Sequence, residues 1–360
     1  MKRILLFLLL ITGTIFLSGC ELPEEKVSSD KDNTVVQENT AGNNEREVKD
    51  QENADDDNEP DEPVEDESPE KPTIQVNLYY QDADGYIVPV TRKLAKQEGI
   101  ARAAINCLID SSLNREEVEY YGLYPVLPKG TSIRGLTIRD GTAVIDFSSE
   151  LLNYDSKRAE INIISSVVYT LTEFNTVQNV KILVDGRQKD KLKFDTDISK
   201  ELNRQNVLIN SDRINLRQDM KKFDVYFYKV ANERFSYILP VSEETSGTGN
   251  DAIISEIIAR LGEDPEREVL VTELPKGTRL IGSSIEADTV TLNISRELTD
   301  YGGNAREEGI LNQILFSMGQ IEGVSKVKIL IAGEATTLPE GTDLTHSMTI
   351  PSAINNYIDK

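Results

Sequence analysis

The segment VLPKGT at residues 126–131 occurs again as ELPKGT at residues 273–278. Two longer segments repeat in the same order: AVIDFSSELLNY, which starts at Ala143, returns as VTLNISRELTDY at Val290, and VKILVDG, which starts at Val180, returns as VKILIAG at Val327. The three separations are equal, since 273, 290 and 327 exceed 126, 143 and 180 by 147 each. A constant separation over three segments indicates two copies of one folded module.

The residues around these segments predict the elements of a module. In the first copy, apolar alternation predicts strands over 74–81, 86–92, 132–138, 143–147 and 178–184, and helical periodicity predicts helices over 98–110 and 156–175. The second copy begins at Phe223, with its first helix over 251–261 and its last strand over 325–331. The predicted fold class is α+β: two tandem modules, each with an α-β-β-α-β core and an extra N-terminal β-hairpin. We expect the first domain at residues 73–205 and the second at residues 222–350.

The second helix of each copy has the clearest pattern. Its apolar stripe is Ile163, Ile164, Val167, Val168, Leu171 and Phe174 in the first copy, and Ile310, Leu311, Ile314, Leu315, Met318 and Ile321 in the second. The stripe stays apolar while the outward face changes freely, which predicts a helix that packs on a sheet with one face. The segment that contains the first helix, between the N-terminal hairpin and the LPKGT motif, is four residues shorter in the second copy. Surface loops tolerate such changes in length.

The N-terminus predicts export and a lipid anchor. Lys2 and Arg3 precede the apolar residues 4–17, and Leu17-Ser18-Gly19-Cys20 follows. This pattern resembles the lipobox of bacterial lipoproteins, which implies a signal peptide over residues 1–19 and a diacylglycerol on Cys20. Two acyl chains anchor a protein stably where a single chain does not.

An acidic segment follows the predicted anchor. Between residues 21 and 71 there are 20 Asp or Glu and 5 Lys or Arg. Low hydrophobicity and like charges predict a disordered tether over residues 20–72. The rest of the chain holds 42 acidic and 32 basic residues, without a basic stripe, which argues against binding nucleic acid.

The repeated LPKGT segment is the main candidate motif. It places Leu127, Pro128, Gly130 and Thr131 in the first copy, and Leu274, Pro275, Gly277 and Thr278 in the second. Proline fixes φ and glycine permits a left-handed turn, so the motif predicts a turn that leads into a strand. A second interpretation is a loop that contacts a partner or a glycan.

The remaining polar candidates argue against catalysis. Asp146 is replaced by Asn293 in the second copy, which favours hydrogen bonding to nearby backbone over proton transfer. His346 has no counterpart, and Cys107 lies in an apolar helical stretch that predicts a buried, inert thiol. No nucleotide, zinc or hydrolase motif is present, so we expect no catalytic residue, no cofactor, no metal and no enzymatic activity.

Two alternatives stay open at this stage. A pair of carboxylates that hydrolyses peptidoglycan meets in space without a fixed sequence spacing, and acids from both modules in one deep pocket would favour that activity. Tyr120, Tyr121 and Tyr124, which precede the first LPKGT, predict loop packing in one interpretation and a glycan or protein contact in the other.

The segments quoted above give a family resemblance. The LPKGT turns, the strand 144–148 and the strand 180–186, with their copies, resemble the GerM family of sporulation and spore germination lipoproteins, which have two GerMN domains. The resemblance covers nearly all of the chain after Pro72 and implies a fold similar to the ring-building motifs of sporulation channels and secretion systems.

The preferred functional hypothesis is a non-enzymatic scaffold on the extracytoplasmic face of the membrane, held by the lipid on Cys20. Its expected partners are envelope proteins of a sporulation complex, within an oligomeric assembly. The alternative is a protein that binds or modifies peptidoglycan of the spore cortex. A solute-binding lipoprotein is third, because such proteins close larger lobes around a ligand.

Overall fold

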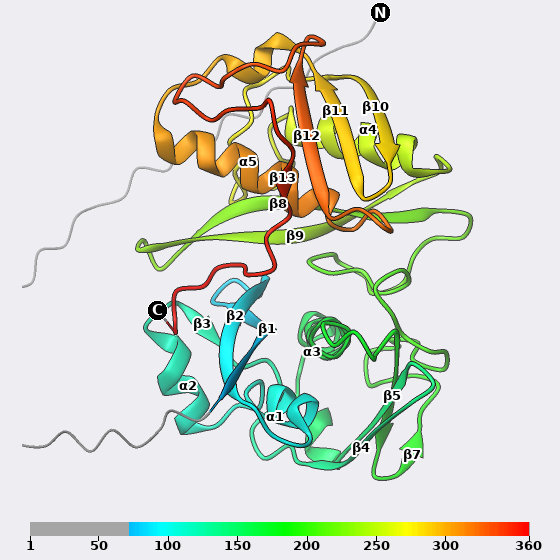
Figure 1. The fold of residues 1–360 in the computed structure, drawn as a ribbon. Coiled ribbons are helices and arrows are strands. Elements are labelled where there is room, and N and C mark those ends of the chain that lie inside the picture. The colour runs from blue at the N-terminus through cyan, green and yellow to red at the C-terminus, as the bar shows by residue number, and fades with distance from the viewer. Residues whose placement is uncertain (1–71, 360) are drawn as a thin grey trace, which may run out of the picture. The chain divides into compact units, whose positions relative to one another are not determined.

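The computed structural model describes residues 72–359 (Figure 1). These residues belong to a single packed unit, in which two α+β modules follow one another. The predicted signal peptide at residues 1–19, the predicted lipidation site Cys20 and the predicted tether up to residue 71 lie outside the described residues. No helix in the described part of the chain is long and apolar enough to cross a membrane.

The first module begins with a β-hairpin. Its elements are β1 (Thr73–Asp82), β2 (Ile87–Ala95), α1 (Ile100–Asn106), α2 (Ser112–Glu119), β3 (Leu123–Tyr124), β4 (Ile133–Arg139), β5 (Thr142–Phe147), the 3-10 helix η1 (Ser149–Leu152), α3 (Lys157–Leu171), β6 (Asn179–Val184) and β7 (Arg187–Gln188).

The second module repeats this order with fewer elements. They are β8 (Lys221–Ala231), β9 (Phe235–Thr245), α4 (Asn250–Leu261), β10 (Leu280–Glu286), β11 (Thr289–Ile294), the 3-10 helix η2 (Arg296–Thr299), α5 (Asn304–Met318), β12 (Lys326–Ile331) and β13 (Met348–Thr349).

Both modules have the same sheet topology, which confirms the predicted fold class. The order is β4-β5-β6-β7 in the first module and β10-β11-β12-β13 in the second. In each sheet only the second and third strands, β5 with β6 and β11 with β12, are parallel, and the other neighbours are antiparallel. The long helix between the two parallel strands is therefore a βαβ crossover. The same β-bulge precedes Gly135 in β4 and Gly282 in β10.

The predicted helix over residues 98–110 was wrong in its extent. Helix α1 ends at Asn106, and Ile109 forms a bridge with Leu127. A second helix, α2, then starts after Ser111, whose side chain accepts the Asn114 N–H at 3.1 Å. Helix α2 buries only Val118, so it lacks the apolar stripe that periodicity detects. No helix occupies this place in the second module, where the segment is shorter.

The core of each module lies between its sheet and its helices. Ala143, Ile145 and Phe147 of β5 are fully buried, and so are Val290, Leu292 and Ile294 of β11. The predicted helical stripe is buried almost throughout, with Phe174 and Leu311 partly exposed. This packing removes the apolar side chains of the strands and those of the helical stripe from water at the same time.

The long helices also bury part of the face that the sequence assigned outward. In α3, Ser166 donates to the Tyr79 carbonyl at 2.5 Å, and Thr170 accepts the Tyr79 N–H at 3.2 Å. In α5, Gln313 and Ser317 make the equivalent bonds to Tyr226 at 2.8 and 3.1 Å. These polar side chains supply the hydrogen bonds that a neighbouring strand would make, so each long helix covers the outer edge of its hairpin at this residue.

A buried glutamate at the start of each long helix holds the loop that follows the last parallel strand. Glu160 accepts the N–H groups of Phe194 and Thr196 at 2.8 and 3.1 Å. Glu307 accepts those of Glu340 and Thr342 at 2.8 and 3.0 Å. In each module a tyrosine hydroxyl also donates to this carboxylate, from Tyr154 and Tyr301. Each carboxylate thus accepts loop N–H groups that would otherwise bond to a neighbouring strand.

The carboxylate of Glu307 should make stability depend on pH. Burial alone would raise the pKa of Glu307, but hydrogen bonds from Thr342, Tyr301 and the loop backbone outweigh burial and hold its pKa below the ordinary value. The stabilisation is therefore present above the unfolded pKa of about 4.3 and is lost as the pH falls through the folded pKa.

We expect Glu307→Gln to lower the free energy of unfolding by about 2 kcal/mol at pH 7, and by less at pH 3. Urea denaturation between pH 7 and pH 3 measures this difference. The exposed Glu322 gives the control, Glu322→Gln, which should follow the wild type at every pH. A difference that stays constant down to pH 3 would contradict the assigned role of Glu307.

Candidate functional site

The two LPKGT motifs form the same turn. Leu127 and Leu274 are buried, and the Thr131 and Thr278 N–H groups each donate to the carbonyl of the motif's proline at 3.1 Å. Gly130 and Gly277 both have φ of 85°, the left-handed conformation that glycine permits. The turn directs the chain into β4 and β10. That these residues also contact a partner stays a prediction.

The structure places the other candidate residues in structural roles. Asp146 accepts the Gly186 N–H at 2.8 Å, and Asn293 accepts the Gly333 N–H at 2.7 Å, which confirms the predicted hydrogen bond to backbone. His346 is largely exposed, 3.8 Å from Asp343. Cys107 is half-buried, and burial raises the pKa of its thiol, which disfavours the reactive thiolate. Residues 72–359 contain no group of three His, Cys, Asp or Glu that could hold a metal ion.

Two of the three tyrosines before the first LPKGT, Tyr120 and Tyr121, pack against the second module. Tyr121 lies 5.1 Å from the ring of Phe235, and its carbonyl accepts the Tyr237 hydroxyl at 2.7 Å. Tyr120 is 63% exposed and still contacts Phe235, ring to ring, at 5.8 Å. The predicted loop packing is therefore confirmed for Tyr121, against the second module, whereas Tyr124 lies in β3 and pairs with Gln81 of the first module.

Two asparagines clamp the hairpins of the modules together. The Asn210 side chain accepts the Ile87 N–H at 2.6 Å and donates to the carbonyls of Ile87 and Pro240, both at 2.8 Å. Asn355 makes the mirror set: it accepts the Ile238 N–H at 3.0 Å and donates to the carbonyls of Ile238 and Pro89, both at 2.7 Å. Each clamp therefore joins β2 of the first module to β9 of the second.

The chain beside each asparagine crosses to the other module. Ile209 exchanges hydrogen bonds with Ser242 of β9, at 2.8 and 3.0 Å. Ile354, in the C-terminal tail, exchanges hydrogen bonds with Thr91 of β2, at 2.7 and 2.9 Å. The seam between the modules is thus approximately twofold, because equivalent residues make equivalent contacts in both directions.

Proline explains why the two strands do not simply pair. Pro89 and Pro240 lie at equivalent places in β2 and β9, where their nitrogens, facing the seam, have no hydrogen to donate. A continuous ladder across the seam would therefore lack donors. The amide groups of Asn210 and Asn355 supply donors and acceptors in its place.

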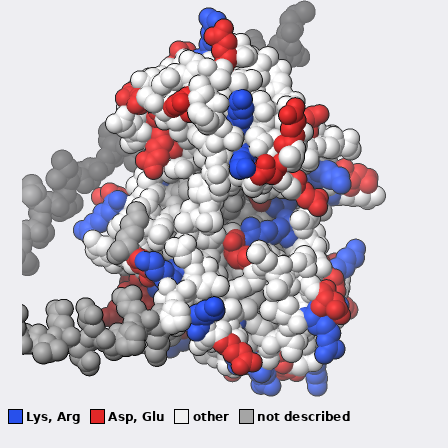
Figure 2. Space-filling model, in the orientation of Figure 1, with Lys and Arg blue, Asp and Glu red and all other residues white. Residues whose placement is uncertain are grey.

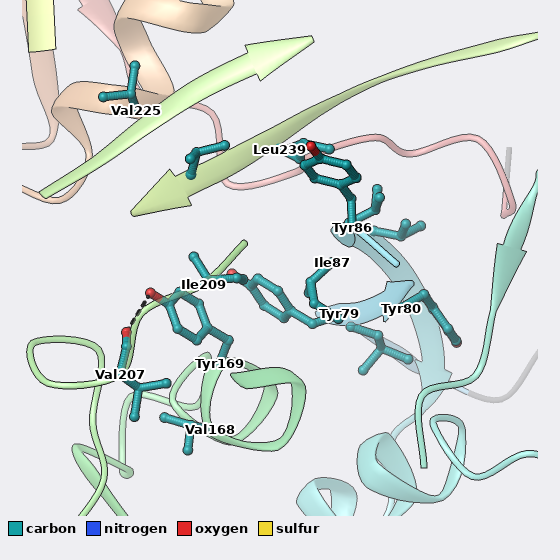
Figure 3. Close-up of a cluster of buried hydrophobic side chains, with 14 of the residues drawn as sticks. Tyr79, Tyr80, Tyr86, Ile87, Val168, Tyr169, Val207, Ile209, Val225 and Leu239 are labelled. Carbon is teal, nitrogen blue, oxygen red and sulfur yellow. Dashed lines mark hydrogen bonds between the residues drawn. The ribbon is translucent and has the colours of Figure 1, made fainter. Parts of the chain in front are cut away.

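Apolar and charged contacts complete the seam. Figure 3 shows Tyr79, Ile87 and Tyr169 of the first module near Ile209 and Leu239, in a cluster of buried side chains. Lys229, with its side chain 5% exposed, contacts Asp82 of the first module at 2.7 Å. Lys229 also contacts Asp84 at 2.7 Å, so removing the lysine, rather than one of the two acids, would leave the buried carboxylate of Asp82 without its cation. The seam is therefore a packed interior, and it fixes the two modules relative to each other.

A cleft with a volume of about 1140 Å³ lies beside the seam. Residues of both modules line it, including the beginnings of β1 and β8 and the ends of α3 and α5. Figure 2 shows acidic and basic atoms next to one another in the hollow between the modules. A cleft of this size between two modules is a common location for binding sites.

The deep charges of the cleft are paired. Arg204 forms an ion pair with Glu173, stacks over Tyr169 at 4.9 Å and donates to the Thr172 hydroxyl at 2.8 Å. Lys222 contacts Asp224 at 2.6 Å, and burial lowers the pKa of this lysine although Asp224 acts in the opposite direction. Glu173 of the first module and Asp224 of the second thus reach one cleft, and each is held by a cation of its own module. These ion pairs hold the two carboxylates in fixed positions.

The sequence did contain a signal for the clamps. Ile209-Asn210 and Ile354-Asn355 lie 145 residues apart, and Ile87-Val88-Pro89 corresponds to Ile238-Leu239-Pro240. Two residues are too short to stand out as a repeat, and the separation differs from 147. Only the fold shows that both asparagines face the same pair of strands.

The fold and the seam define the class: a protein of two tandem α+β modules joined rigidly by an approximately twofold interface. The chain belongs to the Germane family, described as "Sporulation and spore germination", whose pattern matches residues 77–190 and 224–344. The two matches start 147 residues apart, in agreement with the repeat.

Two comparisons with known proteins agree with this assignment. The chain is 28% identical over 291 residues to the spore germination protein GerM of Bacillus subtilis, covering 79% of this chain and 78% of GerM. The structure is similar to the solved tandem GerMN domains of B. subtilis GerM, with a TM-score of 0.68, 28% identity and coverage of 79% of this chain and all of that one.

The asparagine clamp gives a direct test of the seam. Asn210→Asp keeps the size of the side chain and tolerates the positive φ of 53°, but it cannot donate to the carbonyls of Ile87 and Pro240. We expect the free energy of unfolding to fall by about 3 kcal/mol, measured by urea denaturation at pH 7.

The matched control is Asn356→Asp, because the Asn356 side chain makes no hydrogen bond within residues 72–359. It should change stability by less than about 0.5 kcal/mol. Equal effects of the two substitutions would contradict the clamp.

Proposed function

We propose that this protein is a lipid-anchored, extracytoplasmic scaffold in endospore formation and germination, which acts through protein–protein contacts of its two modules. The observation that carries this proposal is the twofold seam, which holds two similar modules in one fixed arrangement. A rigid pair of modules presents two related surfaces to partners at a constant spacing, and engaging both raises avidity without new chemistry.

The family and the charges of the structure support a role without catalysis. The chain belongs to a sporulation and spore germination family and resembles B. subtilis GerM over most of its length. Two of the acids that line the cleft, Glu173 and Asp224, are held by Arg204 and Lys222. The proposed partners are envelope proteins of a sporulation complex, in an oligomeric assembly.

Peptidoglycan binding is the second candidate. The cleft offers stacked aromatic rings, Tyr226 and Phe316, with centroids 5.7 Å apart, together with many amide side chains. Aromatic rings and amides suit a sugar or a stem peptide. Co-sedimentation of the purified protein with cortex sacculi distinguishes this candidate from a scaffold that binds proteins alone.

Complementation of sporulation tests the scaffold. In a spore-forming strain that lacks its own copy of the gene, chains with His346→Ala, Asp146→Asn or Cys107→Ala should give as many heat-resistant spores as the wild type. Asn355→Asp, which loosens the seam, should lower spore yield at a temperature at which the protein stays folded. Loss of sporulation from His346→Ala or Asp146→Asn in a normally folded protein would contradict a non-catalytic role.

The proposed anchor depends on Cys20. Metabolic labelling with palmitate should mark the wild-type chain. The labelled chain should partition into the detergent phase, because two acyl chains hold a protein at a membrane. Cys20→Ala should abolish the label and release the chain, whereas Cys107→Ala should be labelled like the wild type. Equal labelling of the Cys20→Ala chain would disprove the anchor.

A further inference from the structure

Strand β1 has an outer edge that is only partly covered. Tyr79 turns its N–H and C=O away from β2, toward Thr170 and Ser166 of α3. In an antiparallel pair, every second residue points its main-chain groups to the same side. Gln75 and Asn77 precede Tyr79 by four and two residues and therefore also direct their N–H and C=O groups away from β2.

These main-chain groups have no protein partner in the described part of the chain. Within residues 72–359, the N–H and C=O groups of Gln75 and Asn77 make no hydrogen bond, and β3 pairs only with Gln81 and Asp82. Gln75 is exposed and Asn77 is half-buried. An open strand edge of this kind is a template for another extended chain.

The second module closes the same position. Asp224 of β8 corresponds to Asn77, and Gln320 covers its edge by accepting the Asp224 N–H at 2.7 Å and donating to the Asp224 carbonyl at 2.6 Å. A glutamine can make both bonds because its amide is donor and acceptor.

The first module has Glu173 in the place of Gln320, and a carboxylate cannot donate. Glu173 instead accepts from the Asn77 side chain at 3.0 Å and from the Tyr79 hydroxyl at 2.8 Å, and it pairs with Arg204. The replacement of glutamine by glutamate therefore leaves the main-chain groups of Asn77 open, whereas those of Asp224 are covered.

The open edge lies in the wall of the cleft. Residues 74–77 line the cleft, and apolar side chains surround them on both modules: Ile74, Phe174, Ile253, Phe316 and Ile350. The deep charges are balanced within the cleft, since Arg204 pairs with Glu173 and Lys222 with Asp224. A neutral, partly apolar lining complements an uncharged segment with apolar side chains.

The cleft continues into the seam, where the protein already covers strand edges with extended chain. Pro89 and Ile354 belong to both. There the Thr91 N–H of β2 donates to the Ile354 carbonyl at 2.9 Å, and the Ser242 N–H of β9 donates to the Ile209 carbonyl at 3.0 Å. The open edge of β1 is suited to the same kind of contact with an added chain.

We infer that an extended segment of a partner protein binds in the cleft as an added β-strand, with its main chain paired to Gln75 and Asn77. Its apolar side chains alternate between the two walls of the cleft. This inference rests on the proposed scaffold function and names the kind of partner segment: uncharged, extended and rich in apolar residues.

The test uses a substitution that removes one outward N–H. Gln75→Pro deletes the donor without touching the bonds between β1 and β2, because the Gln75 N–H points away from β2. Pro89 shows that this hairpin accepts proline at such a position. Gln75→Ala is the matched control, since it removes the side chain and keeps the N–H. Unfolding midpoints should show that both variants are folded.

The probe is a phage-displayed library of random nine-residue peptides, selected on residues 21–360 of the wild-type protein. Enriched peptides should be uncharged and apolar, bind wild type and Gln75→Ala equally, and bind Gln75→Pro about tenfold more weakly. Hydrogen exchange with a bound peptide should show new protection of the amides of residues 75–77.

Failure to enrich any peptide, equal binding to all three proteins, or protection confined to other segments would overturn the inference. The outcome is independent of the complementation test. Sporulation that tolerates Asp146→Asn and His346→Ala, together with a library that yields no such binder, would retain the scaffold and reject the strand-edge site.

Discussion

The need to pair the edges of the two hairpins governs how this protein is built. Strand β2 and strand β9 meet at the seam, but Pro89 and Pro240 deprive them of donors that a ladder would use. Asn210 and Asn355 restore the pairing through their side-chain amides. On the opposite edges, helices α3 and α5 supply hydroxyl and amide groups to Tyr79 and Tyr226. The two hairpins together have four outer strand edges, and these contacts cover most of the polar main-chain groups along them.

The duplication gives this solution its symmetry. Equivalent residues of two similar modules can satisfy each other in both directions, as two subunits do in a twofold dimer. Here the two copies are separate segments of one chain, so their sequences were free to diverge, unlike those of identical subunits. Glu173 and Gln320 show the result: the same position closes a strand edge in one module and leaves it open in the other. Divergence at this shared position left a strand edge open in the first module, and the open edge is a candidate binding site.

The cleft has the same origin. It lies where the seam ends, and its lining comes from the corresponding parts of both modules. Its two deep cations, Arg204 and Lys222, do not stand free, because each forms an ion pair with an acid of its own module. Ion pairs held in this way fix geometry and offer little proton-transfer chemistry, which agrees with the proposed scaffold.

The sequence by itself determined the duplication, the α+β class and the core, because the alternation of Ala143, Ile145 and Phe147 and the stripe of α3 depend only on local periodicity. It also indicated the LPKGT turns and the backbone role of Asp146, which rest on short-range geometry. The sequence did not predict helix α2, because its surface is polar. Ser166 and Thr170 were expected to face outward, because polar residues usually do. The seam, the buried Glu160 and Glu307, and the open edge of β1 were decided by tertiary structure alone. Each of them depends on which distant main-chain groups still lack a hydrogen-bond partner once the sheets and helices have packed, and that is a property of no single segment.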